Sequence, residues 1–184
     1  LDLSEQISTL LNTKLSENRQ ARIRQVLGQS VKFEERPRRD IDAILLTATS
    51  QNSRQIKPML AFHFAGTYPV YATSHLYDGN PNAVRDIDLN GIRFPDLPWT
   101  LDPQNSLHIE MGQERADTRT RLGRLYALGA DAFILHPYLM QLEGSAEIYF
   151  DGNTGRLSLD PNRRVQRTLD WAEFNEGVPV LLGP

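Results

Sequence analysis

The chain has 184 residues and a net charge of −3, with 40% hydrophobic and 23% charged residues, which is ordinary for a soluble globular protein with a core. It contains no cysteine, which excludes disulfides, thiol nucleophiles and metal sites built on sulfur. It also lacks a sustained basic run and any apolar stretch of the roughly 20 residues that a membrane span needs, so neither nucleic-acid binding nor membrane crossing is predicted.

The basic residues are almost all arginines. Only Lys14, Lys32 and Lys57 are lysines, which leaves 17 arginines. Arginine suits planar contacts with carboxylates and protein surfaces, although the base composition of a genome can produce the same bias.

The N-terminal segment predicts a helix. Leu3–Gly28 has helical apolar spacing, with an expected break near Asn12–Ser16 and with Gly28 at its end. Val31–Glu34 is then expected to be a short extended segment. The start at Leu1 without an initiator Met predicts a processed or excised piece of a longer chain.

The stretch Asp42–Gly79 predicts one βαβ unit, around which the rest is organised. Ala43–Leu46 is a continuous apolar run, typical of a strand buried on both faces, and Val70–Thr73 predicts a second strand. Between them, apolar residues recur at helical spacing from Ile56 to Phe64, and Gly66 is expected to end that helix. Two strands joined by one helix are parallel neighbours, so the predicted fold class is α/β.

A strand and a crossing segment are predicted next. Ile92–Phe94 is expected to be a short strand. Pro95–Trp99 is expected to be extended, because its two prolines disfavour helix, and is the best candidate for a crossing between two lobes.

Two helices are then predicted. In the first, Arg115–Leu128, we expect Leu122 and Leu125 to face inward and Arg124 to face outward. The second, Asp131–Leu142, is apolar nearly all round, so we expect a buried helix with a kink at Pro137.

The chain ends in β-rich segments separated by hairpin-type turns: Ala146–Phe150, Gly155–Leu159 and Val165–Trp171. They predict a short antiparallel C-terminal segment. We therefore expect residues 1–94 to form an α/β lobe, and residues 95–184 to supply the crossover, helices and β segment of the same two-lobed domain.

Polar side chains follow both strands of the βαβ unit. Because ligands bind outside the carboxyl ends of parallel strands, these residues are candidates for a cleft that holds a carboxylate or an amide. They could instead only cap helices and satisfy turn backbone. The candidates are Thr47, Thr49, Ser50, Thr73, Ser74, His75 and Tyr77.

No catalytic or metal-binding pattern emerges. His75 has no obvious nucleophile, since the side chain of the adjacent Ser74 would diverge from it, and His63 lies on an apolar stripe typical of a packed histidine. His108 and His136 lack the spacing of metal ligands. The residues therefore predict no enzyme, no metal and no cofactor, and a hydrolase using His75 is the weakest alternative.

Several contiguous motifs resemble a known family. They are Asp40–Ala43 (DIDA), Arg54–Pro58 (RQIKP), Phe62–Gly66 (FHFAG), Pro69–His75 (PVYATSH) and Leu89–Phe94 (LNGIRF). The chain resembles, over essentially its whole length, the LpoA family of outer-membrane lipoproteins that activate class A penicillin-binding proteins in Gram-negative bacteria.

The resemblance implies a fold similar to type I periplasmic solute-binding proteins, with two α/β lobes and a cleft. It also implies a location in the periplasm, tethered to the inner leaflet of the outer membrane by a lipid anchor outside this chain. The implied function is a non-catalytic docking domain that activates a class A penicillin-binding protein in peptidoglycan synthesis, with peptidoglycan fragments as a further possible partner. Candidate contact residues are Arg36, Arg38, Arg39, Arg115, Arg119 and Arg121. The alternative is a periplasmic solute-binding module for a small polar ligand such as an amino acid or muropeptide.

Overall fold

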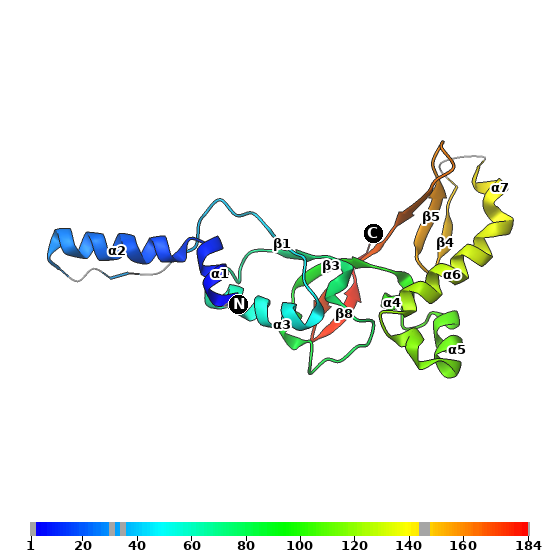
Figure 1. Cartoon of the computed structure of the whole chain (residues 1–184), viewed down its shortest axis with the longest axis horizontal. Helices are drawn as coiled ribbons and strands as arrows, with labels where there is room; N and C mark the ends of the chain where they lie inside the picture. The colour runs from blue at the N-terminus through cyan, green and yellow to red at the C-terminus, as the bar shows by residue number, and fades with distance from the viewer. Residues whose placement is uncertain (1–2, 30–31, 34–35, 144–147, 184) are drawn as a thin grey trace.

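A computed structural model describes residues 3–29, 32–33, 36–143 and 148–183 of the chain (Figure 1). The molecule is elongated, with α2 at one end, a five-stranded sheet in the middle, and α6, α7 and a three-stranded sheet at the other end. The elements are α1 (Leu3–Leu10), α2 (Thr13–Leu27), β1 (Ile44–Leu46), α3 (Ser50–Phe62), β2 (Val70–Ala72), η1 (Ser74–Leu76), η2 (Ile87–Leu89), β3 (Ile92–Asp96), α4 (Pro98–Leu101), α5 (Ser106–Glu114), η3 (Ala116–Arg119), α6 (Gly123–Leu135), η4 (His136–Tyr138), α7 (Leu139–Leu142), β4 (Phe150–Gly152), β5 (Gly155–Leu159), β6 (Val165–Thr168), β7 (Asp170–Asn175) and β8 (Val178–Leu181).

The N-terminal helix is broken, as the sequence predicts. Asn12 adopts a left-handed conformation with φ of 58° between α1 and α2, and Gly28, with φ of 61°, ends α2 by donating its N–H to the Arg24 carbonyl at 3.0 Å. Of the predicted extended segment, Val31 and Glu34 lie outside the described residues, and Lys32 and Phe33 are in no strand.

The predicted βαβ unit is confirmed. Strand β1 runs parallel to β2, with Ile44 opposite Val70, and β2 runs parallel to β3. Burial on both faces is wrong for β1: it is the edge strand of the sheet, and Leu45 is 73% exposed.

The end of α3 differs from the prediction. Phe64, not Gly66, takes the left-handed conformation, with φ of 62°, and the Ala65 N–H donates to the Leu60 carbonyl at 2.8 Å. Gly66 serves close packing instead, because a Cβ there would lie 3.2 Å from Ala61.

The predicted extended segment is only half extended. Pro95 and Asp96 complete β3, but a short helix starts at Pro98. A proline in the first turn of a helix loses no intrahelical hydrogen bond, so it did not exclude helix here.

The helical boundaries that follow are also corrected. Helix α6 begins at Gly123, eight residues after the predicted start, because α5 and η3 come first. Leu122 and Leu125 are exposed, not inward. The expected kink is confirmed, since η4 separates α6 from α7 at Pro137, whereas full burial is wrong, since Phe133 is 83% exposed.

The antiparallel C-terminal segment is confirmed and divides between two sheets. Strands β4, β5 and β6 form their own sheet, whereas β7 turns back to pair with β3, with Phe94 opposite Ala172, and β8 pairs with β7. The predicted strand Val165–Trp171 is therefore two strands: its first part is β6 of the three-stranded sheet, and its last residues begin β7 of the five-stranded sheet. Ala146 and Glu147 of the first predicted segment lie outside the described residues.

The main core lies on the five-stranded sheet. Phe94 and Phe174 stack with centroids 5.2 Å apart, and the ring of Tyr77 packs edge-on against Phe174 at 5.8 Å. All three are at most 3% exposed. This cluster fixes η1, and with it the end of β2, against the sheet.

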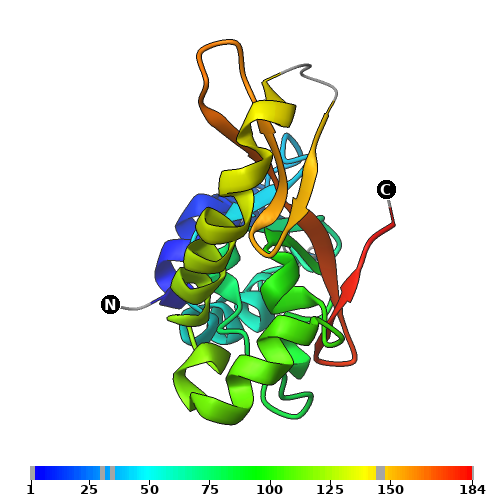
Figure 2. The ribbon, with the colours of Figure 1, turned by 90° about the vertical axis from the view of Figure 1, so that its right-hand side faces the viewer.

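Trp99 joins the two halves of the molecule. Its side chain is 1% exposed and packs with Leu97 and Ala127, and its backbone N–H donates to the Asn153 carbonyl at 3.0 Å. Figure 2 shows α6 lying along the three-stranded sheet beyond this junction. Within the described residues, no helix is both long and apolar enough to span a membrane.

Candidate functional site

A small cavity of about 230 Å³ lies beyond the carboxyl end of β2. One wall is η1, which folds directly after the strand, and the other is the start of α6. Its lining residues are Ser74, His75, Tyr77, Arg121 and Arg124. The cavity therefore stands where the sequence places a cleft, outside the end of a parallel strand.

Arg124 is fixed by hydrogen bonds from two elements. Its guanidinium donates to the Asp96 carboxylate at 2.5 and 3.2 Å, and to the carbonyls of Ser74 at 3.2 Å and Tyr77 at 3.0 Å. Asp96 is fully buried at the end of β3, where it also accepts the Leu97 N–H at 2.9 Å. Burial raises the pKa of Asp96, and the charge of Arg124 opposes that rise.

This arrangement overturns the prediction that Arg124 faces outward. The signal that was missed is Asp96, a carboxylate between Pro95 and Leu97 at the end of a buried strand. A buried carboxylate needs a cationic partner, and an arginine at the start of a nearby helix supplies one.

Three of the seven cleft candidates, Ser74, His75 and Tyr77, line the cavity. The other four are not among its lining residues. Thr49 precedes α3 with no side-chain capping bond, Ser50 is 8% exposed, and the Thr73 N–H donates to the Leu46 carbonyl at 3.3 Å. Thr47 is exposed after β1.

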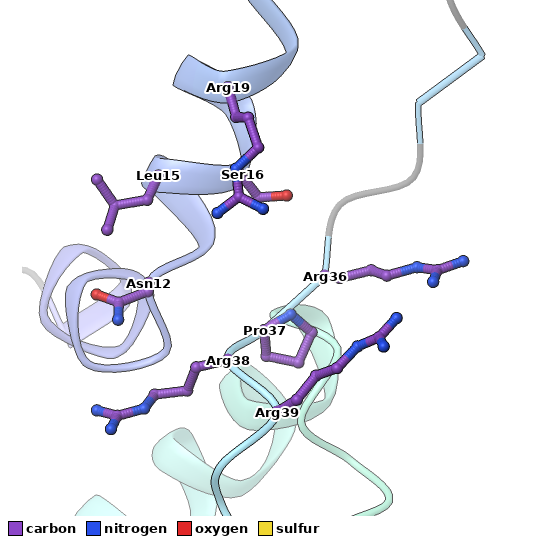
Figure 3. A pocket seen from close by; sticks show the side chains of 8 residues that line it. All are labelled: Asn12, Leu15, Ser16, Arg19, Arg36, Pro37, Arg38 and Arg39. Atoms are coloured by element: carbon purple, nitrogen blue, oxygen red, sulfur yellow. The ribbon is translucent and has the colours of Figure 1, made fainter.

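A second, larger hollow of about 470 Å³ lies between the start of α2 and residues 36–39 (Figure 3). It carries four arginines, and none of the described residues that line it is acidic. In Figure 3, the side chains of Arg36 and Arg39 extend to the same side, and that of Arg38 to the other. The lining residues are Asn12, Leu15, Ser16, Arg19, Arg36, Pro37, Arg38 and Arg39.

The segment that carries these arginines is tied to the body. The Arg38 N–H donates to the Leu11 carbonyl at 2.9 Å, and the Tyr68 hydroxyl donates to the Arg38 carbonyl at 3.1 Å. The Arg38 guanidinium binds Asp40 at 2.5 and 2.6 Å, and this hydrogen bond lowers the pKa of Asp40 to about 2. Arg19 was missed from the sequence, because a charge on a polar helix face carries no signal of what lies opposite.

The remaining partner candidates lie at the far end of the molecule. Arg115 lies 3.6 Å from Asp117 and 5.3 Å from the Tyr126 ring centroid. Arg119 is exposed at the end of η3, and Arg121 lines the small cavity. In Figure 1 this region lies near α5 and α6, opposite the end that carries α2, so the two arginine groups do not form one surface.

Two of the histidines, His63 and His108, lie in structural settings. His63 is 9% exposed, and its Nε2 lies 3.0 Å from the Ser4 hydroxyl. His108 stacks on Trp99 with ring centroids 4.6 Å apart. In the described part of the chain, no three His, Asp or Glu side chains are grouped so that they could hold a metal ion.

Comparisons with known proteins agree over most of the chain. A family model described as "LppC putative lipoprotein" matches residues 1–177. The chain is 32% identical, over 181 residues, to a protein of Photobacterium profundum named "Penicillin-binding protein activator LpoA", covering 96% of this chain and 29% of that protein. It is 31% identical over 172 residues to the protein of the same name in Vibrio cholerae, covering 93% of this chain and 28% of that protein.

Solved structures show the same fold. The C-domain of LpoA from Haemophilus influenzae, described as a regulator of PBP1A, superposes with a TM-score of 0.67 at 22% identity, over 91% of this chain and 57% of that chain. Full-length LpoA from the same organism gives a TM-score of 0.68 at 23% identity, over 91% of this chain and 33% of that chain. The chain thus spans less than a third of the length of the curated relatives above, and the fold class predicted from the sequence is confirmed.

Proposed function

Because this chain belongs to the LppC family of lipoproteins, as its match over residues 1–177 shows, we propose that it is a non-catalytic docking domain that activates a class A penicillin-binding protein. The family resemblance found in the sequence motifs is confirmed by that match. The observation that carries the proposal is the 32% identity, over 96% of this chain, to a protein named for activating a penicillin-binding protein. The activator's role in peptidoglycan synthesis and its tethering to the outer membrane from the periplasm are part of the proposal.

The arginine hollow is the proposed contact surface. It offers several guanidinium groups next to the start of α2, of which that of Arg38 is already bound to Asp40. Arg19 and Arg39 are exposed, so a partner can reach them. Such a surface fits an acidic patch on the synthase, and association should then weaken as salt screens the charges. Arg115, Arg119 and Arg121 remain a second candidate surface.

The test is a titration of the purified chain with the periplasmic part of a class A penicillin-binding protein at two salt concentrations. We expect saturable binding that weakens at higher salt and in the double variant Arg19→Ala/Arg39→Ala. The matched control is Arg164→Ala, an exposed arginine in the turn before β6. No binding by a chain that circular dichroism shows to be folded would refute docking through these residues.

A second candidate function, a solute-binding module, is favoured by the small cavity beside Ser74, His75 and Tyr77. Ligand sites of this architecture combine a preformed hollow with a few convergent polar groups. A thermal-shift screen with amino acids and muropeptides tests it, because a ligand that binds only the folded chain raises the melting temperature. A screen without any shift at millimolar ligand would remove this candidate.

A further inference from the structure

We propose that the small cavity between η1 and α6 is a carboxylate-binding subsite, in which Arg121 contacts the ligand and Arg124 is a positioning residue. The proposed ligand class is a small molecule with a free α-carboxylate, such as an amino acid or a short peptide. This inference rests on the solute-binding candidate, and does not depend on docking to the synthase.

The first argument is charge. Two guanidinium groups line the cavity, and among the described lining residues there is no carboxylate. The carboxylate that pairs with one of them, Asp96, is buried and bound to Arg124. Arg121 makes no hydrogen bond or ion pair within the described residues and is exposed, so its charge is left for a ligand.

The second argument is preorganisation. All four hydrogen bonds of Arg124 use Nε and Nη2, which leaves the two N–H groups of Nη1 without a partner in the described part of the chain. Asp96, Ser74 and Tyr77 already hold this guanidinium in place. A ligand that binds it therefore loses little free energy to the ordering of the arginine side chain. The positive end of the α6 dipole lies at the same wall.

The third argument is size and composition. At about 230 Å³ the cavity is smaller than the roughly 300–1,000 Å³ of sites for drug-sized ligands, so it suits a small molecule or one end of a larger one. Ser74, His75 and Tyr77 add groups that can hydrogen-bond, beside two cations. Arginine donors match the two oxygens of a carboxylate, and hydrogen bonds between such charged partners are stronger than neutral ones.

The test compares alanyl-alanine with its C-terminal amide, in a buffer whose only anion is chloride. Binding is followed by ¹H–¹⁵N NMR, using the backbone amides of η1 and the arginine Nε–H signals. We expect the free acid to bind at least about tenfold more tightly than the amide. We also expect Arg121→Gln to lower the affinity for the acid by about tenfold, and Arg164→Gln, the matched control, to leave it unchanged.

The outcomes separate the proposals. Equal binding of acid and amide, or unchanged affinity in Arg121→Gln, overturns carboxylate recognition and leaves a solute site of another kind. No binding of either probe at millimolar concentration overturns the subsite. Neither result bears on the docking proposal. Arg121→Gln is therefore also titrated with the synthase. If this variant lost binding to the synthase and kept its affinity for the free acid, Arg121 would be assigned to docking instead.

Discussion

The two sheets of this molecule are stabilised in different ways. The core of the five-stranded sheet is made of large side chains that are at most 1% exposed, among them Leu76, Leu89, Ile92, Phe94 and Phe174. The three-stranded sheet has a core of four buried leucines: Leu135, Leu142, Leu157 and Leu159. Burial of apolar side chains therefore contributes most of the stability of the five-stranded sheet, and contributes less to that of the three-stranded sheet.

The smaller region has a buried polar clamp in addition. Asp131 on α6 is 2% exposed, and its carboxylate accepts hydrogen bonds from the backbone N–H of Asn153 at 2.7 Å and of Thr154 at 2.7 Å. The side chains of the same two residues donate at 2.9 and 2.6 Å. Gly152 is required beside it, because a Cβ there would lie 2.6 Å from a carboxylate oxygen. One carboxylate thus fixes the turn between β4 and β5 onto the helix.

The largest expected effect is in the five-stranded sheet. Phe174→Ala removes a side chain that is 1% exposed and stacked on Phe94, and it should lower the free energy of unfolding by about 3–5 kcal/mol. Chemical denaturation measures this, with Val180→Ala on β8, where the side chain is 45% exposed, as the control. If both variants lost the same small amount, aromatic packing would not be what holds this sheet.

A smaller and more local effect is expected from Asp131→Ala. It removes the acceptor of two backbone N–H groups, that of Thr154 buried and that of Asn153 partly buried, which should cost about 2–3 kcal/mol. Hydrogen exchange should accelerate in β4 and β5 and stay unchanged in β1–β3, because local opening follows local stability. Asp131→Asn, which keeps the shape and one acceptor oxygen, should lose less. Uniform acceleration across both sheets would show that the two regions unfold as one.

The sequence predicted the βαβ unit because its signals are local. Apolar runs, a helical period and turn residues define β1, α3 and β2 within 30 residues. The same holds for the hairpin between β4 and β5, where Asp151–Gly155 is a turn signal. The pairing of β7 with β3 had no local signal, because residues about 80 positions apart meet only in the folded chain.

The placement of candidate site residues depends on how local their signals are. Ser74, His75 and Tyr77 line a cavity beyond β2, and their place after a parallel strand can be predicted from the sequence; that they bind a ligand stays a prediction. Arg124 was assigned to the wrong face, because its orientation depends on Asp96, 28 residues away. The opposite error was made for Phe133 on α6 and Met140 on α7. Both were expected to be buried because they are apolar, and both are exposed.

The smallest expected effect lies at the junction between the two sheets, at His108. Burial lowers its pKa below the ordinary 6.5, and the nearby charge of Arg119 adds to this, while the carbonyls of Trp99 and Thr118 act in the opposite direction. The unfolded chain therefore takes up a proton near pH 6.5, whereas the folded chain does so only at lower pH. Unfolding is thus favoured as pH falls through 6.5.

The measurement is the melting temperature of the natural chain and of His108→Phe across this pH range. Phenylalanine cannot be protonated and can still stack on Trp99, where the two rings now lie 4.6 Å apart. The natural chain should lose stability relative to the variant as pH falls, and the difference should level off below the folded pKa. Because Trp99 also binds the Asn153 carbonyl, the loss should appear first in the amides of α4, α5 and the β4–β5 turn. If the melting temperatures of the two proteins changed in parallel with pH, His108 would be protonated as readily in the folded chain as in the unfolded one. The junction would then not exclude solvent from this side chain.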